Sequence, residues 1–119
     1  MKILLVDNSK AMRLIVRRNL DQSGIAGLEV TEACSGAEAL VAIRADEPDL
    51  VLSDWNMPEM NGIELLQALR AEDCQVKFGF VTSESQGHIK DLALDSGAMF
   101  VIIKPFTAED LQKMLLHVT

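Results

Sequence analysis

Four chemically active side chains stand at the ends of short apolar runs in this 119-residue sequence: Asp7, Asp54, Thr82 and Lys104. Such runs, bounded by polar residues, are typical of strands buried on both faces of a sheet. Open α/β sheets bind their ligands at the carboxyl ends of the strands. No two of the four belong to one local motif, so only a shared sheet edge would bring them together. Two carboxylates, a hydroxyl and an ammonium at one edge could bind a cation and an anionic group.

Alternating strand and helix patterns predict an α/β fold with a doubly wound parallel sheet. Five strands are predicted, over residues 3–6, 28–33, 50–52, 76–81 and 100–103. Each is followed by a helical pattern, which implies right-handed crossovers and five helices distributed over both faces. No linker or repeat interrupts the pattern. Residues 1–119 are therefore expected to form one domain.

Capping residues and apolar spacing place the predicted helices. Ser35 and Glu38 have the spacing of a capping box, in which each side chain bonds the other's backbone N–H, and this helix is expected to end near residue 47. Three other helices are predicted to begin after the capping residues Ser9, Asn61 and Thr107. In the first helix, the apolar residues at helical spacing are Met12, Ile15, Val16 and Leu20. The second strand carries Glu29, Thr31 and Glu32, so less burial is expected there.

The composition argues against several functional classes. A formal net charge of −7 disfavours direct binding to nucleic acid, whose phosphates need a basic surface. No run of about 18 apolar residues is present, so no transmembrane helix is expected. The first residues become acidic too early for a signal peptide, and a cytoplasmic location is expected. Cys34 and Cys74 lie outside any C-x-x-C pattern, so neither a disulfide nor a zinc site is expected.

Four short motifs surround the candidate residues and together span essentially the whole chain. They are Val6-Asp7 with Met12-Arg13, Asp54-Trp55-Asn56-Met57-Pro58 with Gly62, Val81-Thr82 with Glu84, and Lys104-Pro105-Phe106. As a set they resemble the receiver domain of two-component response regulators, most closely the single-domain chemotaxis type. The resemblance implies a flavodoxin-like fold with strand order 2-1-3-4-5. It also implies a cis peptide bond between Lys104 and Pro105.

The resemblance further implies that Asp54 accepts a phosphoryl group from a sensor histidine kinase, with Mg²⁺ as cofactor. A carboxylate can hold such a group as an acyl phosphate, provided that positive charge offsets the repulsion between the two anions. The implied metal ligands are Asp7, Asp54 and the backbone carbonyl of Asn56. Lys104 would act as a fixed charge, and the Thr82 hydroxyl would donate to the phosphoryl group. Such a receiver promotes only its own phosphorylation and dephosphorylation, and is not otherwise an enzyme.

Two positions depart from the family pattern. The family usually carries a second acid after the first strand, and here that residue is Asn8. An amide oxygen coordinates without charge, so Asn8 is expected to be a weakened ligand that lowers Mg²⁺ affinity about tenfold. The aromatic switch residue is replaced by Val101, while Phe100 should point to the opposite face. Switching is then expected to depend on the loop from Thr82 to Glu84 and on residues 85–88.

Two polar residues are expected to tune the lifetime of the phosphoryl group. Asn56 and Glu84 lie two positions after Asp54 and Thr82, where the family controls access of water. Both can orient water, so short-lived phosphorylation is expected. These residues include no output domain. The signal is therefore expected to reach a protein target through the surface of the fourth helix, fifth strand and fifth helix.

Two other interpretations remain open at this point. A degenerate receiver would bind a partner without being phosphorylated. Asn8 and Val101 favour it, whereas Asp54, Thr82 and Lys104 oppose it. A stand-alone hydrolase with an aspartyl-phosphate intermediate would need a substrate pocket and a second acid–base group. No P-loop pattern is present, so nucleotide hydrolysis is not expected.

Overall fold

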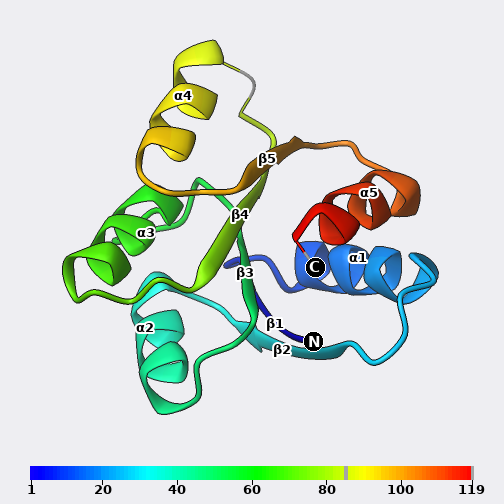
Figure 1. Cartoon of the computed structure of the whole chain (residues 1–119). Helices are drawn as coiled ribbons and strands as arrows, with labels where there is room; N and C mark the ends of the chain where they lie inside the picture. The colour runs from blue at the N-terminus through cyan, green and yellow to red at the C-terminus, as the bar shows by residue number, and fades with distance from the viewer. Residues whose placement is uncertain (85, 119) are drawn as a thin grey trace.

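A computed structural model describes residues 1–84 and 86–118 of the chain and confirms the predicted α/β architecture. One parallel sheet has the order β2-β1-β3-β4-β5. Its strands are β1 (Lys2–Val6), β2 (Glu29–Ala33), β3 (Leu50–Ser53), β4 (Lys77–Thr82) and β5 (Phe100–Ile103). The helices are α1 (Lys10–Gln22), α2 (Gly36–Ala45), α3 (Gly62–Ala71), α4 (Gly87–Asp95) and α5 (Ala108–Val118). Figure 1 shows α2, α3 and α4 on one face of the sheet, with α1 and α5 on the other.

Each face of the sheet has its own hydrophobic core. Leu4 and Val51 pack toward α2, α3 and α4, whereas Leu5 and Leu52 pack toward α1 and α5. The central strands therefore need apolar side chains at consecutive positions, which accounts for the unbroken runs in the sequence. Along β5, Phe100 and Val101 belong to opposite cores, as strand alternation predicts.

The edge strand β2 is more exposed than the central strands, as its polar residues predict. Glu29, Thr31 and Glu32 are exposed, whereas residues 3–6 of the adjacent β1 are buried. The predicted cis peptide bond between Lys104 and Pro105 is present. Within the described residues, none of the helices combines the length and apolarity that crossing a bilayer requires.

Helix capping agrees with the predictions at three sites and differs at one. Asn61 and Glu64 form a complete capping box at the start of α3. At α2, the Ser35 hydroxyl accepts the Glu38 N–H as predicted, but the return bond to Ser35 is absent. The Glu38 carboxylate instead accepts from the backbone N–H of Cys34 and from its thiol, at 3.4 and 3.0 Å. One of the two hydrogen bonds of the predicted capping box is therefore present. The other is absent, because the Glu38 carboxylate accepts from the N–H and the thiol of Cys34 instead.

Two other details of the helices were not predicted. Of the apolar residues at helical spacing in α1, Val16 and Leu20 are buried, whereas the Ile15 side chain is 46 % exposed. Ile15 lies at the margin of α1, beside the segment that follows β5. Helix α2 ends at Ala45 rather than near residue 47. Of the predicted switch segment 85–88, Ser85 lies outside the described residues.

Candidate functional site

The sheet order brings the carboxyl ends of β1, β3, β4 and β5 side by side. The Nζ of Lys104, which directly follows β5, lies 3.6 Å from Asp7 Oδ2 and 3.7 Å from Asp54 Oδ2. Thr82 ends β4 and is fully buried. A single ammonium therefore holds two carboxylates that are 47 positions apart in sequence close to one point.

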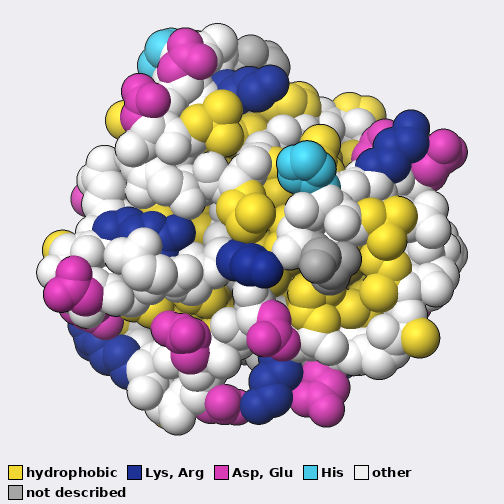
Figure 2. Space-filling view, viewed as in Figure 1, with side chains coloured by type: hydrophobic (Ala, Val, Ile, Leu, Met, Phe, Trp, Pro, Cys, Tyr) yellow, Lys and Arg dark blue, Asp and Glu magenta, His cyan; other side chains and the backbone are white. Residues whose placement is uncertain are grey.

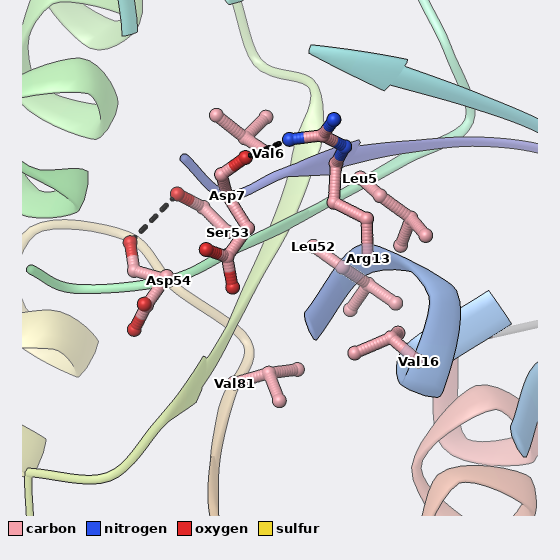
Figure 3. A pocket seen from close by; sticks show the side chains of 9 residues that line it. All are labelled: Leu5, Val6, Asp7, Arg13, Val16, Leu52, Ser53, Asp54 and Val81. Atoms are coloured by element: carbon pink, nitrogen blue, oxygen red, sulfur yellow. Dashed lines mark hydrogen bonds between the residues drawn. The ribbon is translucent and has the colours of Figure 1, made fainter. Parts of the chain in front are cut away.

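Asp54 is held by its own backbone and by its neighbours. One carboxylate oxygen, Oδ1, accepts the Trp55 N–H at 2.7 Å. The Asp54 backbone N–H donates to the carbonyl of Val6 at 2.9 Å, and the Ser53 hydroxyl donates to the Asp54 carbonyl at 2.8 Å (Figure 3). These contacts leave Oδ2 as the oxygen beside Lys104. The side chain is 15 % exposed, so the free oxygen remains accessible from the sheet edge.

Burial raises the pKa of the Asp54 carboxyl above its ordinary value. The Lys104 ammonium and the backbone N–H groups of Trp55 and Asn56 lower it, whereas the carboxylate of Asp7 raises it further. The net result is a pKa above the ordinary value for this carboxyl group. In the absence of a bound cation, the ionised carboxylate is thus held at some cost to the folded state.

Replacing Asp54 with asparagine should therefore stabilise the metal-free protein at neutral pH. Because the folded pKa is raised, the native state binds more protons than the unfolded state, and stability falls as pH rises through the carboxyl range. In a buffer containing a metal chelator at pH 7, the variant should melt about 3–5 °C higher than the wild type. Below the ordinary carboxyl range the difference should disappear. Asp91→Asn, at an exposed position of α4, is the control, and equal differences at both pH values would contradict the expectation.

The two predicted tuning residues are bonded to each other. Asn56 Nδ2 donates to Glu84 Oε1 at 2.8 Å, which joins the loop after β3 to the loop after β4. The backbone N–H of Glu84 donates to the Thr82 hydroxyl oxygen at 3.1 Å. If Thr82 turned toward a group on Asp54, Glu84 would lose this acceptor. The threonine is therefore mechanically linked to the segment that leads into α4.

The donor set is compatible with a hydrated Mg²⁺ ion. Asp7 Oδ2 and Asp54 Oδ2 both converge on Lys104 Nζ, and Mg²⁺ sites commonly use one or two carboxylates and retain several waters. Asn8 is exposed and adds no charge. Across the described residues, no three His, Cys, Asp or Glu side chains are grouped so as to hold a metal ion. The site can thus supply two carboxylates, with amide and carbonyl oxygens as further ligands.

Two residues that contact this site were not singled out from the sequence. Ser53 is fully buried and orients the Asp54 carbonyl. Arg13 belongs to one of the sequence motifs but was not given as a site residue, and its guanidinium donates to the backbone carbonyl of Asp7 at 2.6 Å. Arg13 and Arg17 both pair with Glu32 of β2, at 2.8 Å each. Their spacing of four residues along one helix, opposite a strand acid, was the available signal.

Comparison with known proteins identifies the family. The sequence model of the family described as the response regulator receiver domain matches residues 3–116. The chain belongs to this family. Chemotaxis protein CheY1 of Helicobacter pylori is 35 % identical over 118 residues, covering 97 % of this chain and 94 % of that protein. A CheY homologue of Campylobacter jejuni is 38 % identical, with 97 % and 89 % of the two chains covered.

Solved receiver structures agree with this assignment. Vibrio cholerae chemotaxis protein CheY4 has a TM-score of 0.87 at 33 % identity, covering 99 % of this chain and 98 % of that one. The receiver domain of Francisella response regulator 1452 has a TM-score of 0.88 at 26 % identity, covering 98 % and 94 %. The chain is thus a response regulator receiver domain of the CheY type. The carboxylate pair and Lys104 lie at the carboxyl edge of its sheet.

Proposed function

We propose that this receiver, over residues 1–119, is a phosphorylation-controlled module of two-component signalling. It accepts a phosphoryl group from a sensor histidine kinase on Asp54 and signals by protein contact. The observation that carries the proposal is the position of the Lys104 ammonium, 3.6 and 3.7 Å from the carboxylates of Asp7 and Asp54. A solely structural module would have no need of two partly desolvated carboxylates converging at one edge.

Each residue at the site has a role in the proposed phosphoryl transfer. Asp54 Oδ2 attacks phosphorus while Oδ1 stays bonded to the Trp55 N–H, so an oxygen–phosphorus bond forms as the bond from phosphorus to the donor breaks. Lys104 neutralises charge on the phosphoryl oxygens, and the Thr82 hydroxyl donates to one of them. Mg²⁺, bound by Asp7, Asp54, the Asn56 carbonyl and weakly by Asn8, would supply the remaining positive charge.

The approach of the kinase would follow an apolar hollow beside the site. Met12 and Ile15 of α1 line it together with Lys104, Pro105 and Phe106. This hollow opens next to the lysine that contacts Asp54. A donor histidine on an apolar helical surface could therefore dock there and still reach the carboxylate.

The linked pair of Asn56 and Glu84 supports a short phosphoryl lifetime. Both side chains are polar, and their hydrogen bond joins the loops that follow Asp54 and Thr82. A carboxylate and an amide in this position can orient water toward the phosphorus. The receiver would then reset itself by hydrolysis of the acyl phosphate.

The output surface is proposed to lie between α4, β5 and α5. A hollow there is lined by Lys90, Leu94, Met99, Phe100, Val101, Lys113, Met114 and His117. Figure 2 shows hydrophobic side chains exposed in this region beside a histidine. The rim is basic although the chain carries a net charge of −7. A target segment with apolar and acidic side chains would complement it.

Intact-mass spectrometry after incubation with Mg²⁺ and a small acyl-phosphate donor tests the proposal. One phosphoryl adduct is expected on the wild type and none on Asp54→Ala. An adduct that persists in the variant would place the modification elsewhere. No adduct on the wild type, even at high Mg²⁺, would favour the second candidate, a degenerate receiver. The neutral, exposed Asn8 is the observation that favours this alternative.

Restoring the acid at position 8 should strengthen metal binding. Asn8→Asp adds a charged oxygen ligand beside Asp7, and about tenfold tighter Mg²⁺ binding is expected after solvent screening and desolvation are allowed for. The quenching of Trp55, the only tryptophan and the neighbour of Asp54, can report the titration. Asn19→Asp, on α1 away from the site, is the control. Equal dissociation constants for Asn8→Asp and the wild type would refute the expectation.

A further inference from the structure

We infer that Arg13 is a positioning residue, which fixes the Asp7 carboxylate for metal binding by clamping the Asp7–Asn8 peptide. The inference rests on the proposed function in so far as Asp7 is taken as a metal ligand. Figure 3 shows the guanidinium of Arg13 directed at the backbone of Asp7. The Arg13 side chain is 14 % exposed and lines the same small pocket as Asp7 and Asp54.

The guanidinium is held from two directions. Its Nη1 donates to the Asp7 carbonyl at 2.6 Å, and its Nε donates to Glu32 Oε1 at 2.8 Å. The other Glu32 oxygen accepts from Arg17 at 2.8 Å. In the sheet, Glu32 pairs with Leu5, two residues before Asp7. The arginine thereby ties the end of β1 to the neighbouring edge strand through α1.

The clamp acts on Asp7 through the backbone. An acceptor bond to the carbonyl fixes the plane of the peptide that joins Asp7 to Asn8. Beyond this peptide, the Ser9 N–H donates to Asp7 Oδ1 at 2.9 Å. One oxygen of the carboxylate is thus held by the turn that Arg13 orients, which leaves Oδ2 facing Lys104. Asn8 contributes no charge, so Asp7 supplies the carboxylate that directly follows β1. Metal affinity should therefore depend strongly on the direction in which the Asp7 carboxylate points.

An arginine suits this role better than a lysine. The planar guanidinium donates along two separate directions from one rigid group, whereas an ammonium on a flexible stem does not keep both contacts with fixed geometry. Outer partners that orient a metal ligand commonly affect affinity by ten- to a hundredfold. Loss of the clamp should therefore weaken the metal site without unfolding the sheet.

Two readouts on the folded protein test the inference. In Arg13→Gln, hydrogen exchange of the Ser9 amide in metal-free protein should accelerate about tenfold, and the Mg²⁺ dissociation constant, followed by Trp55 fluorescence, should rise about tenfold. Arg13→Lys should recover only part of both effects. Glu32→Gln, which loosens the far end of the clamp, should show smaller changes of the same sign. Arg18→Gln, exposed on the same helix, is the matched control and should change neither.

The outcomes separate this inference from the proposed function. Unchanged Ser9 exchange in Arg13→Gln would overturn it, and so would faster exchange with an unchanged dissociation constant. A lower melting temperature with both readouts unchanged would show that Arg13 is only structural, which also overturns it. A wild type that binds no Mg²⁺ would instead contradict the proposed function, while Ser9 exchange would still decide whether Arg13 holds Asp7.

Discussion

Replacing Lys104 with methionine is expected to slow phosphorylation of Asp54 by a small acyl-phosphate donor about a hundredfold or more. The lysine is the cation that lies 3.6 and 3.7 Å from the two carboxylates, and its side chain is only 14 % exposed. A preorganised charge in a partly desolvated site typically contributes a factor of 10² to 10³ to the rate. Methionine keeps the length and the apolar stem of the side chain but removes the charge.

The loss should lie in the transfer step and not in metal binding. Because an ammonium opposes a second cation at the same carboxylates, Mg²⁺ should bind Lys104→Met at least as tightly as the wild type. Rates measured at saturating Mg²⁺, with the metal titration run in parallel, distinguish the two steps. Lys113→Met is the matched control, since Lys113 is 71 % exposed and pairs with Glu109 of its own helix. A rate within threefold of the wild type would remove Lys104 from the proposed mechanism.

Gly62→Ala is expected to destabilise the fold by about 3 kcal/mol and to disturb Asp54, the proposed phosphoacceptor. A Cβ at Gly62 would overlap the Asp54 carbonyl oxygen and lie 2.7 Å from the Phe80 ring. Neither the Asp54 carbonyl nor the Phe80 ring can move away easily. The carbonyl accepts the Ser53 hydroxyl, and Phe80 is fully buried against Trp55, with ring centroids 4.8 Å apart. The Gly62 N–H also closes the loop by donating to the Trp55 carbonyl at 2.8 Å.

Denaturant unfolding of Gly62→Ala beside Gly87→Ala provides the measurement. Gly87 begins α4, and nothing lies within 4 Å of a Cβ built there. Alanine at this position should be neutral or stabilising by up to about 1 kcal/mol. The Gly62 variant should also be phosphorylated more slowly than its loss of stability explains, since its Asp54 backbone must move. Equal stabilities of the two variants would show that the loop absorbs the methyl group.

Much of the fold was predictable because the parallel strands are covered on both faces. Burial on both sides leaves continuous apolar runs, and the polar residue that ends each run marks the carboxyl edge of the sheet. Asp7, Asp54 and Lys104 were placed at one edge by this argument, and in the structure the Lys104 ammonium lies within 3.7 Å of both carboxylates. Local rules also placed Asn61 and Thr107 at the starts of α3 and α5.

Local sequence patterns left two side-chain positions undecided or wrong. Helical spacing alone could not show that Ile15 lies beside the segment after β5 and is 46 % exposed. The capping-box pattern could not show that the Glu38 carboxylate would accept hydrogen bonds from Cys34 rather than from the N–H of Ser35. In both cases the deciding contact lies outside the repeating pattern that the prediction used.

The sequence by itself determined the strand order through family resemblance, and it showed which residue types stand at the strand ends: Asp7, Asp54, Thr82 and Lys104. These depend on which residue types occur and where the apolar runs end. Only the tertiary structure decided that Arg13 holds the Asp7 carbonyl and that Asn56 bonds Glu84. Such contacts join different strands and loops, so their partners are set by sheet register and helix packing rather than by spacing along the chain. The residue types at the strand ends therefore set which chemistry is available, whereas the folded sheet and the helices packed on it set where those side chains lie.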